Sequence, residues 1–431
     1  MRADQPMLEP AHAMRHGMSG SDNKALAILF VCHRFPFPPH GGAKVRAFHM
    51  IRHLAQRHMV TVASLVRSRE EAAEGTGIAP YCARYEMARV RAPAQLLRMI
   101  ACLPTSIPSS LAYFKSVALE RWIDALVARE RFDLVVAHSS SMAQYVEHIG
   151  GVPKIMDFCD MDAQKWREYA RYKPFPLSLG YALEASKLMR EEGRIARSFD
   201  ICTLATPAEQ ATLDGYGTGA RTDWFPNGVD TDYFTPSSVA YDPDLIVFVG
   251  RMDYYPNEEC MMTFCADVLP RLRARRSNTK LAIVGANPPA SVRALSRLAG
   301  VAVTGSVPDV RPYLHRAALM VAPLNIARGT QNKILEGMAS GVPVVASRMA
   351  ADGVDARAEE DFLVATTQEG QAAAILRVLD DATERARLAQ AGRARVLSHH
   401  TWPMAMRRFD EIVERCLART SASVVPAWRC P

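Results

Sequence analysis

Two series of short, almost continuously apolar runs limit most strongly how this chain can fold. Helix-like patterns separate the runs, and each run has the length of a strand. Parallel strands that helices cover on both faces lose the alternation of polar and apolar residues, so such runs predict an α/β fold with two doubly wound parallel sheets. The first series covers residues 25–32, 59–66, 132–138, 154–159 and 201–205, and the second covers 245–250, 280–285, 301–305, 319–324 and 342–347.

A turn-rich stretch, FPNGVDTDYFTPSS, separates the two series and predicts a domain boundary. An amphipathic pattern at 401–417 predicts a closing helix with Thr401 as its N-cap. Open α/β sheets bind ligands beyond the carboxyl ends of their strands, so we expect the site there. The predicted organisation is a tail at 1–23, an N-terminal domain at 24–235, a C-terminal domain at 236–397, and the closing helix and tail at 398–431.

Composition excludes several classes of protein. With 49 % hydrophobic and 23 % charged residues, the 431-residue chain is neither disordered nor fibrous. Its net charge of +7 favours phosphate-bearing partners or an anionic membrane surface without singling out nucleic acid. The nine cysteines form no CxxC pair and are interpreted as reduced, buried thiols of a cytosolic protein. No apolar run is long enough to span a membrane, and a cytoplasmic location is expected.

The segment APLNIARGTQNKILEGMASGVPVVAS, residues 322–347, is the most informative for function. A strand is predicted to end at Pro323 and a helix to begin near Asn332, where free backbone N–H groups and the helix dipole favour an anion. Lys333 adds a full positive charge there. Glu336 lies one turn deeper on the same face, where its carboxylate would accept hydrogen bonds from vicinal hydroxyls such as those of a ribose. A surface Lys–Glu pair is the alternative interpretation.

Three passages resemble the glycosyltransferases of family 4, also called group 1, which have the GT-B fold. LEGMASGVPVVAS is similar to the family's LEAMAxGxPVVAS, FPNGVDTDYF resembles its NGVD linker, and Gly250-Arg251 stands where the family has a strand-terminal GR. The similarity covers residues 25–415 and is stronger in the C-terminal half. The resemblance implies two Rossmann-like domains that face a central cleft, followed by a C-terminal helix. Within the family, the sequence resembles sugar transferases associated with exopolysaccharides.

The resemblance also implies which residues hold the sugar donor. The family's donor loop carries a Glu-x7-Glu motif; Glu336 corresponds to the second glutamate, and Arg328 stands in place of the first. A related branch reads GGGTRxKxLEAMA, which this chain matches more closely. We expect Arg328 to act in catalysis as a phosphate or carboxylate clamp. The expected donor-binding residues of the C-terminal domain are Gly250, Arg251, Gly329, Thr330, Gln331, Lys333 and Glu336.

A second departure from the family concerns the charge on the donor's diphosphate. Many relatives have a phosphate-binding lysine five residues after the arginine of the GR pair, where this chain has Pro256. Arg251 and Lys333 are therefore expected to supply the positive charge between them and to stabilise the departing diphosphate without a metal. Apart from its place in the GR pair, Arg251 would be interpreted as an exposed arginine of a loop.

Gly41, Gly42 and His138 are the candidates in the N-terminal domain. The two glycines precede the first predicted helix, where the lack of a Cβ lets the backbone approach a phosphate or sugar, and the family has a similar GG loop. His138 closes a predicted strand. In relatives a histidine at this strand end contacts the donor sugar or supports catalysis, whereas an isolated histidine is more often structural.

Neither of two possible metal sites is favoured. Asp157, Asp160 and Asp162 are of the type that binds Mg²⁺, but their loop would equally cap the following helix, and the family resembled is metal-independent. His49 and His53 share one helix face without a third ligand or an HExxH motif. We expect no metal and no cofactor, only a nucleotide-diphosphate sugar as co-substrate.

Residues 165–175, KWREYARYKPF, interleave four aromatic with four basic side chains. Such a stretch suits a lipid headgroup layer, and peripheral membrane association is one interpretation. A segment at the rim of the site that packs on its own domain is the other. No nucleic-acid-binding module accompanies the stretch.

The resemblance implies a retaining glycosyltransferase. It would move a sugar from a nucleotide-diphosphate sugar to a glycan or lipid-linked acceptor, in the biosynthesis of exopolysaccharide or another cell-surface polysaccharide. Two alternatives remain open at this point: a nucleotide-sugar 2-epimerase of related fold, and a non-catalytic protein that binds sugar nucleotides.

Overall fold

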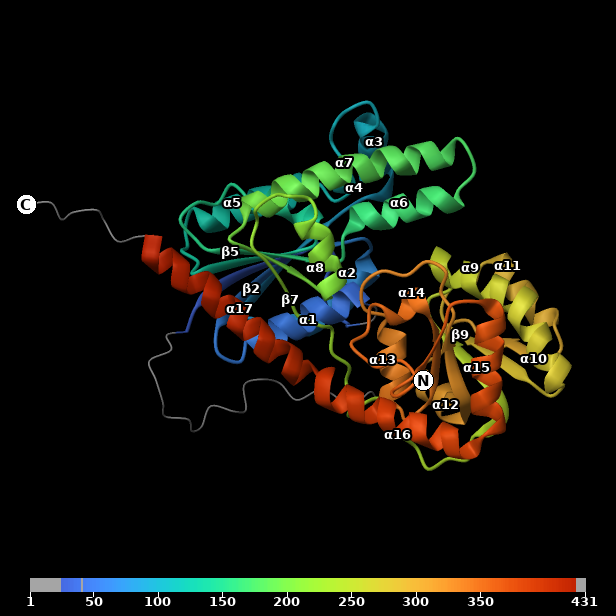
Figure 1. Cartoon of the computed structure of the whole chain (residues 1–431). Helices are drawn as coiled ribbons and strands as arrows, with labels where there is room; N and C mark the ends of the chain where they lie inside the picture. Colours follow the sequence, from blue (N-terminus) through green and yellow to red (C-terminus); the bar gives the residue numbers. More distant parts are fainter. Residues whose placement is uncertain (1–24, 40–41, 424–431) are drawn as a thin grey trace, which may run out of the picture. The chain divides into compact units, whose positions relative to one another are not determined.

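The predicted apolar runs form two separate parallel sheets in the computed structural model, which describes residues 25–39 and 42–423 (Figure 1). The contacts divide the chain into two units. The C-terminal unit is Pro226–Ala405, and the N-terminal unit holds the described residues up to Phe225 together with those from Met406 onward. Helices flank both sheets. The predicted α/β class with two doubly wound sheets is therefore confirmed.

The N-terminal unit has a seven-stranded parallel sheet in the order β3-β2-β1-β4-β5-β6-β7. The sequence did not predict β3 or β7, because these short edge strands carry polar residues and lack an apolar run. The strands are β1 (Ala27–Cys32), β2 (Met59–Val66), β3 (Arg84–Arg89), β4 (Leu134–His138), β5 (Lys154–Cys159), β6 (Ile201–Leu204) and β7 (Thr222–Trp224).

Buried apolar helix faces cover this sheet, and Ser116 and Thr206 cap the starts of α5 and α8 by accepting hydrogen bonds from backbone N–H groups. The helices are α1 (Gly42–Leu54), α2 (Arg69–Gly75), α3 (Ala92–Cys102), α4 (Ser109–Tyr113), α5 (Val117–Val127), α6 (Asp162–Tyr172), α7 (Leu177–Ser198) and α8 (Pro207–Asp214), with 3₁₀ turns η2 (Thr76–Tyr81) and η3 (Ser140–Tyr145). None of the helices in the described part of the chain is long and apolar enough to cross a membrane.

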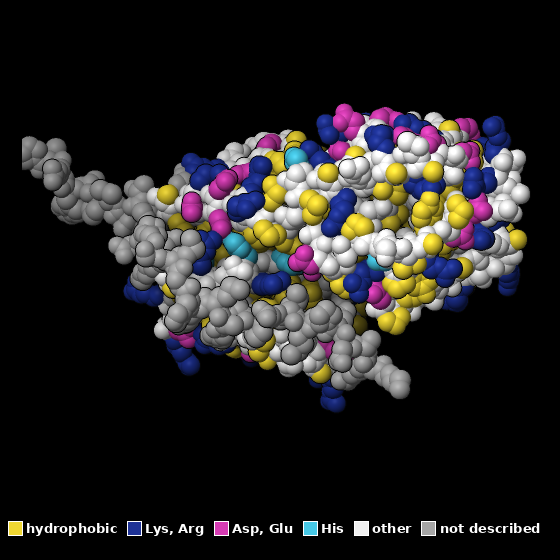
Figure 2. Space-filling view, turned by 90° about the horizontal axis from the view of Figure 1, so that it is seen from below, with side chains coloured by type: hydrophobic (Ala, Val, Ile, Leu, Met, Phe, Trp, Pro, Cys, Tyr) yellow, Lys and Arg dark blue, Asp and Glu magenta, His cyan; other side chains and the backbone are white. Residues whose placement is uncertain are grey.

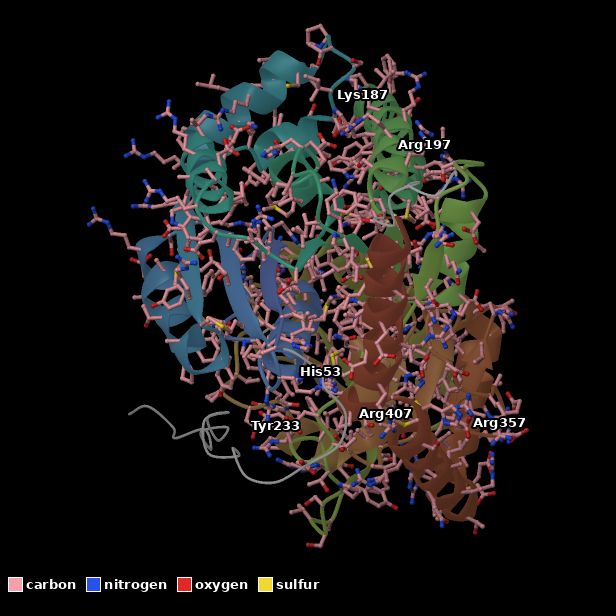
Figure 3. The ribbon with its side chains drawn as sticks, turned by 90° about the vertical axis from the view of Figure 1, so that its left-hand side faces the viewer. His53, Lys187, Arg197, Tyr233, Arg357 and Arg407 are labelled. Carbon is pink, nitrogen blue, oxygen red and sulfur yellow. The ribbon has the colours of Figure 1, made fainter. Side chains whose placement is uncertain are left out.

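The closing helix α17 (Trp402–Ser423) begins in the C-terminal unit and continues into the N-terminal unit. Its Asp410 accepts hydrogen bonds from His53 on α1 and from Arg57, at 2.8 and 2.6 Å. Figure 3 shows His53 on the side of α1 that faces α17. The C-terminal segment is thus part of the N-terminal unit.

The C-terminal unit has a six-stranded parallel sheet in the order β10-β9-β8-β11-β12-β13. Its strands are β8 (Asp242–Val249), β9 (Lys280–Val284), β10 (Val301–Val303), β11 (Ala317–Ala322), β12 (Val344–Ser347) and β13 (Leu363–Ala365). Its helices are α9 (Tyr255–Thr263), α10 (Leu269–Arg275), α11 (Ala290–Ala294), α12 (Arg311–Arg316), α13 (Asn332–Ala339), α14 (Arg348–Ala351), α15 (Gln368–Asp380) and α16 (Ala382–His399), with the short turns η4 (Phe264–Val268) and η5 (Leu295–Arg297).

The chain passes from one unit to the other at Phe225 and Pro226, whereas the composition of the linker places the boundary at residues 235 and 236. Phe225 still belongs to the N-terminal unit, because its ring packs on Phe409 with 5.0 Å between centroids. The polar turn that follows folds onto the C-terminal unit, where the Tyr233 hydroxyl donates to Asp309 at 3.1 Å. Turn composition thus marks the linker region, and packing decides where it divides.

A fully buried ion pair joins α1 to the sheet of the N-terminal unit. Arg46 donates to both carboxylate oxygens of Asp157, at 2.9 and 3.0 Å, and neither side chain is exposed. Arg46 also donates to the Phe225 carbonyl at 3.0 Å and lies over the Phe225 ring. The pair therefore connects three segments that are far apart in the sequence.

Replacing one member of this pair is expected to destabilise the N-terminal unit strongly. The change Arg46→Leu leaves Asp157 buried without its main counter-charge, a loss on the order of 3 to 5 kcal/mol. Equilibrium urea unfolding measures it. The matched control is Arg84→Leu, which breaks the exposed ion pair with Glu130 and should barely move the midpoint. Equal midpoints for the two variants would contradict the assigned role of the buried pair.

Candidate active site

Gly250 lies where the end of β8 meets two polar side chains. A Cβ atom on Gly250 would come within 2.8 Å of the Asn257 amide nitrogen and 3.1 Å of Lys333 Nζ. A Cβ on Gly285, which follows β9, would lie 1.8 Å from the Gly250 carbonyl oxygen. The absence of side chains at both positions lets the two strand ends and the lysine come together.

Lys333 is held at this point by contacts from β8 and α9. Its Nζ donates to Asn257 Oδ1 at 2.6 Å and lies 4.4 Å from the centroid of the Phe248 ring. The Asn257 amide in turn donates to the Arg251 carbonyl at 2.8 Å. Burial lowers the pKa of Lys333 to about 8, only partly opposed by Glu336. Lys333 is therefore a desolvated cation that an anion would stabilise.

The turn before α13 presents backbone toward the same region. Gly329 has a left-handed φ of 58°, and its carbonyl oxygen lies 1.9 Å from where a Cβ of Gly353 would be. The Gln331 side chain donates to the Arg328 carbonyl at 2.9 Å and does not cap the helix. Since no side chain caps α13, the first N–H groups of the helix remain suited to an anion.

Glu336 lies one turn into α13, half-buried. None of the described residues donates a hydrogen bond to its carboxylate. Burial raises the pKa of Glu336 to about 7, with Lys333 opposing the shift. An acceptor without a partner, next to an anion site, is chemically suited to a hydroxyl-bearing ligand.

Arg251 and Arg328 are placed differently from Lys333. Arg251 is exposed and forms a bidentate ion pair with Asp253, with 2.6 Å between Nη2 and Oδ2. Arg328 is half-buried, and its carbonyl accepts the hydrogen bond from Gln331. The structure thus brings Gly250, Lys333 and the start of α13 together, whereas binding of phosphate by Arg251 would require it to exchange its partner Asp253.

In the N-terminal unit, His138 lies in a row of residues at the carboxyl ends of four strands. The strand register places Cys32, His138, Asp157 and Thr203 side by side on β1, β4, β5 and β6. His138 Nδ1 lies 2.7 Å from Asp157 Oδ2, and Thr203 donates to Asp157 Oδ1 at 2.9 Å. The sheet itself therefore assembles this group.

Asp157 decides which nitrogen of His138 is available. Burial alone would raise the pKa of Asp157, but the Arg46 charge and the hydrogen bond from His138 hold it well below its ordinary value. An ionised Asp157 can only accept a hydrogen bond from Nδ1, so Nδ1 carries the hydrogen and Nε2 points the other way. His138 Nε2 is buried without a partner among the described residues.

His33 and Asn257 are site residues that sequence reasoning missed. His33 stacks on His138 with 5.8 Å between ring centroids, and burial lowers the pKa of His33 well below its ordinary value. The only sequence signal for His33 is its place directly after the first strand. Asn257 carried no signal, because its contact with Lys333 joins residues that are 76 positions apart.

Several other predicted residues can now be placed. Gly42 is the first residue of α1, and Gly41 lies outside the described residues. Of the three aspartates, Asp157 is engaged by Arg46, and Asp162 pairs with Lys165 at 3.4 Å. Within the described residues, no group of three or more His, Cys, Asp or Glu side chains is arranged to hold a metal ion.

Comparison with known families identifies the chain. The model for Glycosyltransferase Family 4 matches residues 40–233, and the model for Glycosyl transferases group 1 matches residues 243–381. The chain belongs to the family 4, group 1 glycosyltransferases. This glycosyltransferase has the GT-B fold, and the resemblance read from the three sequence passages is confirmed.

Two curated relatives carry specific names. A D-inositol 3-phosphate glycosyltransferase from Nocardiopsis dassonvillei is 25 % identical over 333 residues, which cover 70 % of this chain and 74 % of that protein. A GDP-mannose-dependent alpha-(1-6)-phosphatidylinositol monomannoside mannosyltransferase from Mycolicibacterium smegmatis is 29 % identical over 181 residues, 36 % of this chain and 46 % of that protein. Both are sugar transferases, in agreement with the family.

Solved structures show the same fold at low identity. Sucrose-phosphate synthase from Thermosynechococcus elongatus superposes with a TM-score of 0.67 and 16 % identity, covering 91 % of this chain and all of that one. HepE from Anabaena, in complex with UDP and glucose, superposes with a TM-score of 0.65 and 14 % identity, covering 90 % of this chain and all of HepE.

The state of Lys333 predicts how nucleotide binding depends on pH. A bound diphosphate favours charged Lys333, so affinity should fall as pH rises through about 8, where the free protein loses this proton. Lys333→Met should lose about 1.5 to 3 kcal/mol of binding free energy at neutral pH and show no such fall. Calorimetric titration with a panel of nucleoside diphosphates measures both effects.

Glu336→Ala should weaken the same binding by a similar amount, because it removes the acceptor proposed for the ribose hydroxyls. Lys280→Met removes an exposed lysine of the same unit, paired with Asp242, and serves as the control. Wild-type affinity in both Lys333→Met and Glu336→Ala would place the nucleotide elsewhere.

Proposed function

We propose that this glycosyltransferase moves a sugar from a nucleotide-diphosphate sugar to a glycan or lipid-linked acceptor with retention of configuration, in the biosynthesis of exopolysaccharide or another cell-surface polysaccharide. The observation that carries the proposal is Lys333, desolvated beside Gly250 and next to the uncapped start of α13. This arrangement provides a charge and free N–H groups for a diphosphate. The open carboxylate of Glu336 provides an acceptor for hydroxyls.

The comparisons support sugar transfer from a nucleotide sugar at a coarser level. HepE was solved with UDP and glucose, which are a nucleoside diphosphate and a sugar. The mycobacterial relative is named for a GDP-mannose donor and a phosphatidylinositol mannoside acceptor. WaaG, described as a glycosyltransferase involved in lipopolysaccharide biosynthesis, superposes with a TM-score of 0.57 and 17 % identity, covering 89 % of this chain and 99 % of WaaG.

In the proposed reaction, the acceptor oxygen bonds to the anomeric carbon on the face from which the diphosphate leaves. The acceptor proton passes to the departing phosphate oxygen, so no protein nucleophile is required. Lys333 and the α13 N–H groups stabilise the charge that develops on the diphosphate, which is the task that a metal performs in other transferases. The proposal therefore includes activity without a metal.

His138 is proposed to orient the donor sugar. Asp157 fixes the proton on Nδ1, and Nε2 is then left to accept a hydrogen bond from a sugar hydroxyl. Arg46 acts through Asp157 and is a positioning residue, since it keeps that carboxylate ionised.

A panel of radiolabelled sugar nucleotides tests the proposed function. Purified protein with membrane extract should transfer label to lipid or glycan, and transfer should persist in EDTA. Release of an epimerised sugar nucleotide without an acceptor would show a 2-epimerase. Absence of turnover with every donor would show a binding protein, and loss of activity in EDTA that Mg²⁺ restores would refute metal independence.

Arg328 is proposed to clamp a phosphate or a carboxylate of the donor, such as that of a uronic-acid nucleotide, because a guanidinium can only donate where the family's glutamate would accept. Arg328→Glu should reduce kcat/KM for transfer at least a hundredfold by placing like charge beside the diphosphate, and Arg328→Lys should retain part of the activity. Arg297→Glu, an exposed change in the same unit, is the charge-matched control. Activity of Arg328→Glu at or above that of wild type would reject the clamp.

A further inference from the structure

Helix α3 has its polar and apolar faces reversed relative to an ordinary surface helix. Gln95 is buried, with 2 % of its surface exposed, and its side chain donates to the Lys115 carbonyl at 3.3 Å. Arg98 donates to the same carbonyl. Leu96 and Leu97 point into solvent, and Leu97 is 69 % exposed. A helix that only covers the core of its own domain turns its leucines inward. The outward leucines of α3 therefore indicate a surface that binds another molecule or a membrane.

The segment after α3 presents further apolar side chains from a fixed backbone. Leu103 and Ile107 are both exposed. Lys187 on α7 donates to the carbonyls of Cys102 and Leu103, at 3.0 and 2.9 Å. Figure 3 shows Lys187 on α7, below the segment that contains α3. The exposed side chains therefore stand on an anchored segment.

The turn between α6 and α7 and the start of α7 expose further apolar side chains. Phe175 is 81 % exposed at this turn. By contrast, Trp166 and Tyr169 of the stretch 165–175 pack on Tyr181, with centroid distances of 5.1 and 6.2 Å. Packing on its own domain thus describes Trp166 and Tyr169, whereas contact with a lipid headgroup layer stays an interpretation for Phe175. We call the exposed apolar set the α3–α7 surface; it comprises Leu96, Leu97, Ile100, Leu103, Ile107, Phe175, Leu177, Leu179 and Leu183.

The charges around the α3–α7 surface have one sign. Residues 87–119 contain no Asp or Glu, and residues 163–190 contain only Glu168 and Glu184, which are both buried. Glu184 accepts hydrogen bonds from the backbone N–H groups of Ser109 and Ser110. The face seen in Figure 2 instead carries acidic and basic side chains interspersed. The exposed cations of the two segments are Arg89, Arg91, Arg167, Arg171 and Arg190.

We propose that the α3–α7 surface docks on an anionic lipid bilayer. Its leucines and Phe175 would enter the boundary between headgroups and acyl chains, while the arginines contact lipid phosphates. A second copy of the chain is the weaker candidate, because it would place one cationic surface against another. The inference deepens the proposed function, since a lipid-linked acceptor lies in such a bilayer.

Vesicle flotation of the whole protein, without donor or acceptor, tests the docking. Wild type should float with vesicles of equal phosphatidylglycerol and phosphatidylcholine, and should float less with phosphatidylcholine alone or as salt screens the attraction. L97E/L103E should lower the partition coefficient at least tenfold, and R167E/R171E should lower it by a similar factor. The matched controls are M59E, an exposed apolar residue of β2, and R129E/R131E, which changes the net charge equally in the same unit.

Three results would overturn the docking proposal. In the first, the wild-type protein does not bind anionic vesicles. In the second, the L97E/L103E and R167E/R171E variants float like wild type. In the third, light scattering shows a concentration-dependent dimer that L97E/L103E abolishes. Titration of the same variants with nucleoside diphosphates distinguishes the docking proposal from the proposed function. Lost flotation with retained nucleotide binding supports the docking surface, and failure of sugar transfer leaves the flotation result standing.

Discussion

The Asp157 carboxylate is the constraint on which the N-terminal unit depends. An isolated buried carboxylate costs several kcal/mol, so its position requires the two donors of Arg46 and the hydroxyl of Thr203. These partners come from α1 and β6, on either side of Asp157 in β5. Arg46 extends the group to Phe225, the last residue before the chain enters the C-terminal unit. Because Asp157 stays ionised, the same group fixes the tautomer of His138. One charge thus serves both the packing of the unit and the chemistry of its strand ends.

The C-terminal unit contains a charge with less compensation. Lys333 has an amide oxygen and an aromatic face as partners, and burial lowers its pKa. Burial has the opposite effect on Glu336, one turn away, because it raises the pKa of that carboxyl group. A cation and a carboxylate that lie on α13 without full neutralisation destabilise the free protein, and a ligand that brings phosphate and hydroxyl groups would relieve that cost. The same reasoning applies to the exposed leucines of α3. Their exposure to water is unfavourable, and docking on a lipid surface would remove it.

The sequence by itself determined the two parallel sheets, because strands covered on both faces read as continuous apolar runs. It also determined that Lys333 and Glu336 share a helix face, since three residues make nearly one helical turn. It did not determine the edge strands β3, β7 and β13, whose short or polar sequences resemble loops. Nor did it determine the pairing of Lys333 with Asn257 or of Arg46 with Asp157, residues 76 and 111 positions apart. Periodicity reports whether a residue is buried, whereas strand order and register decide which distant side chain it meets, and only the tertiary structure contains that information.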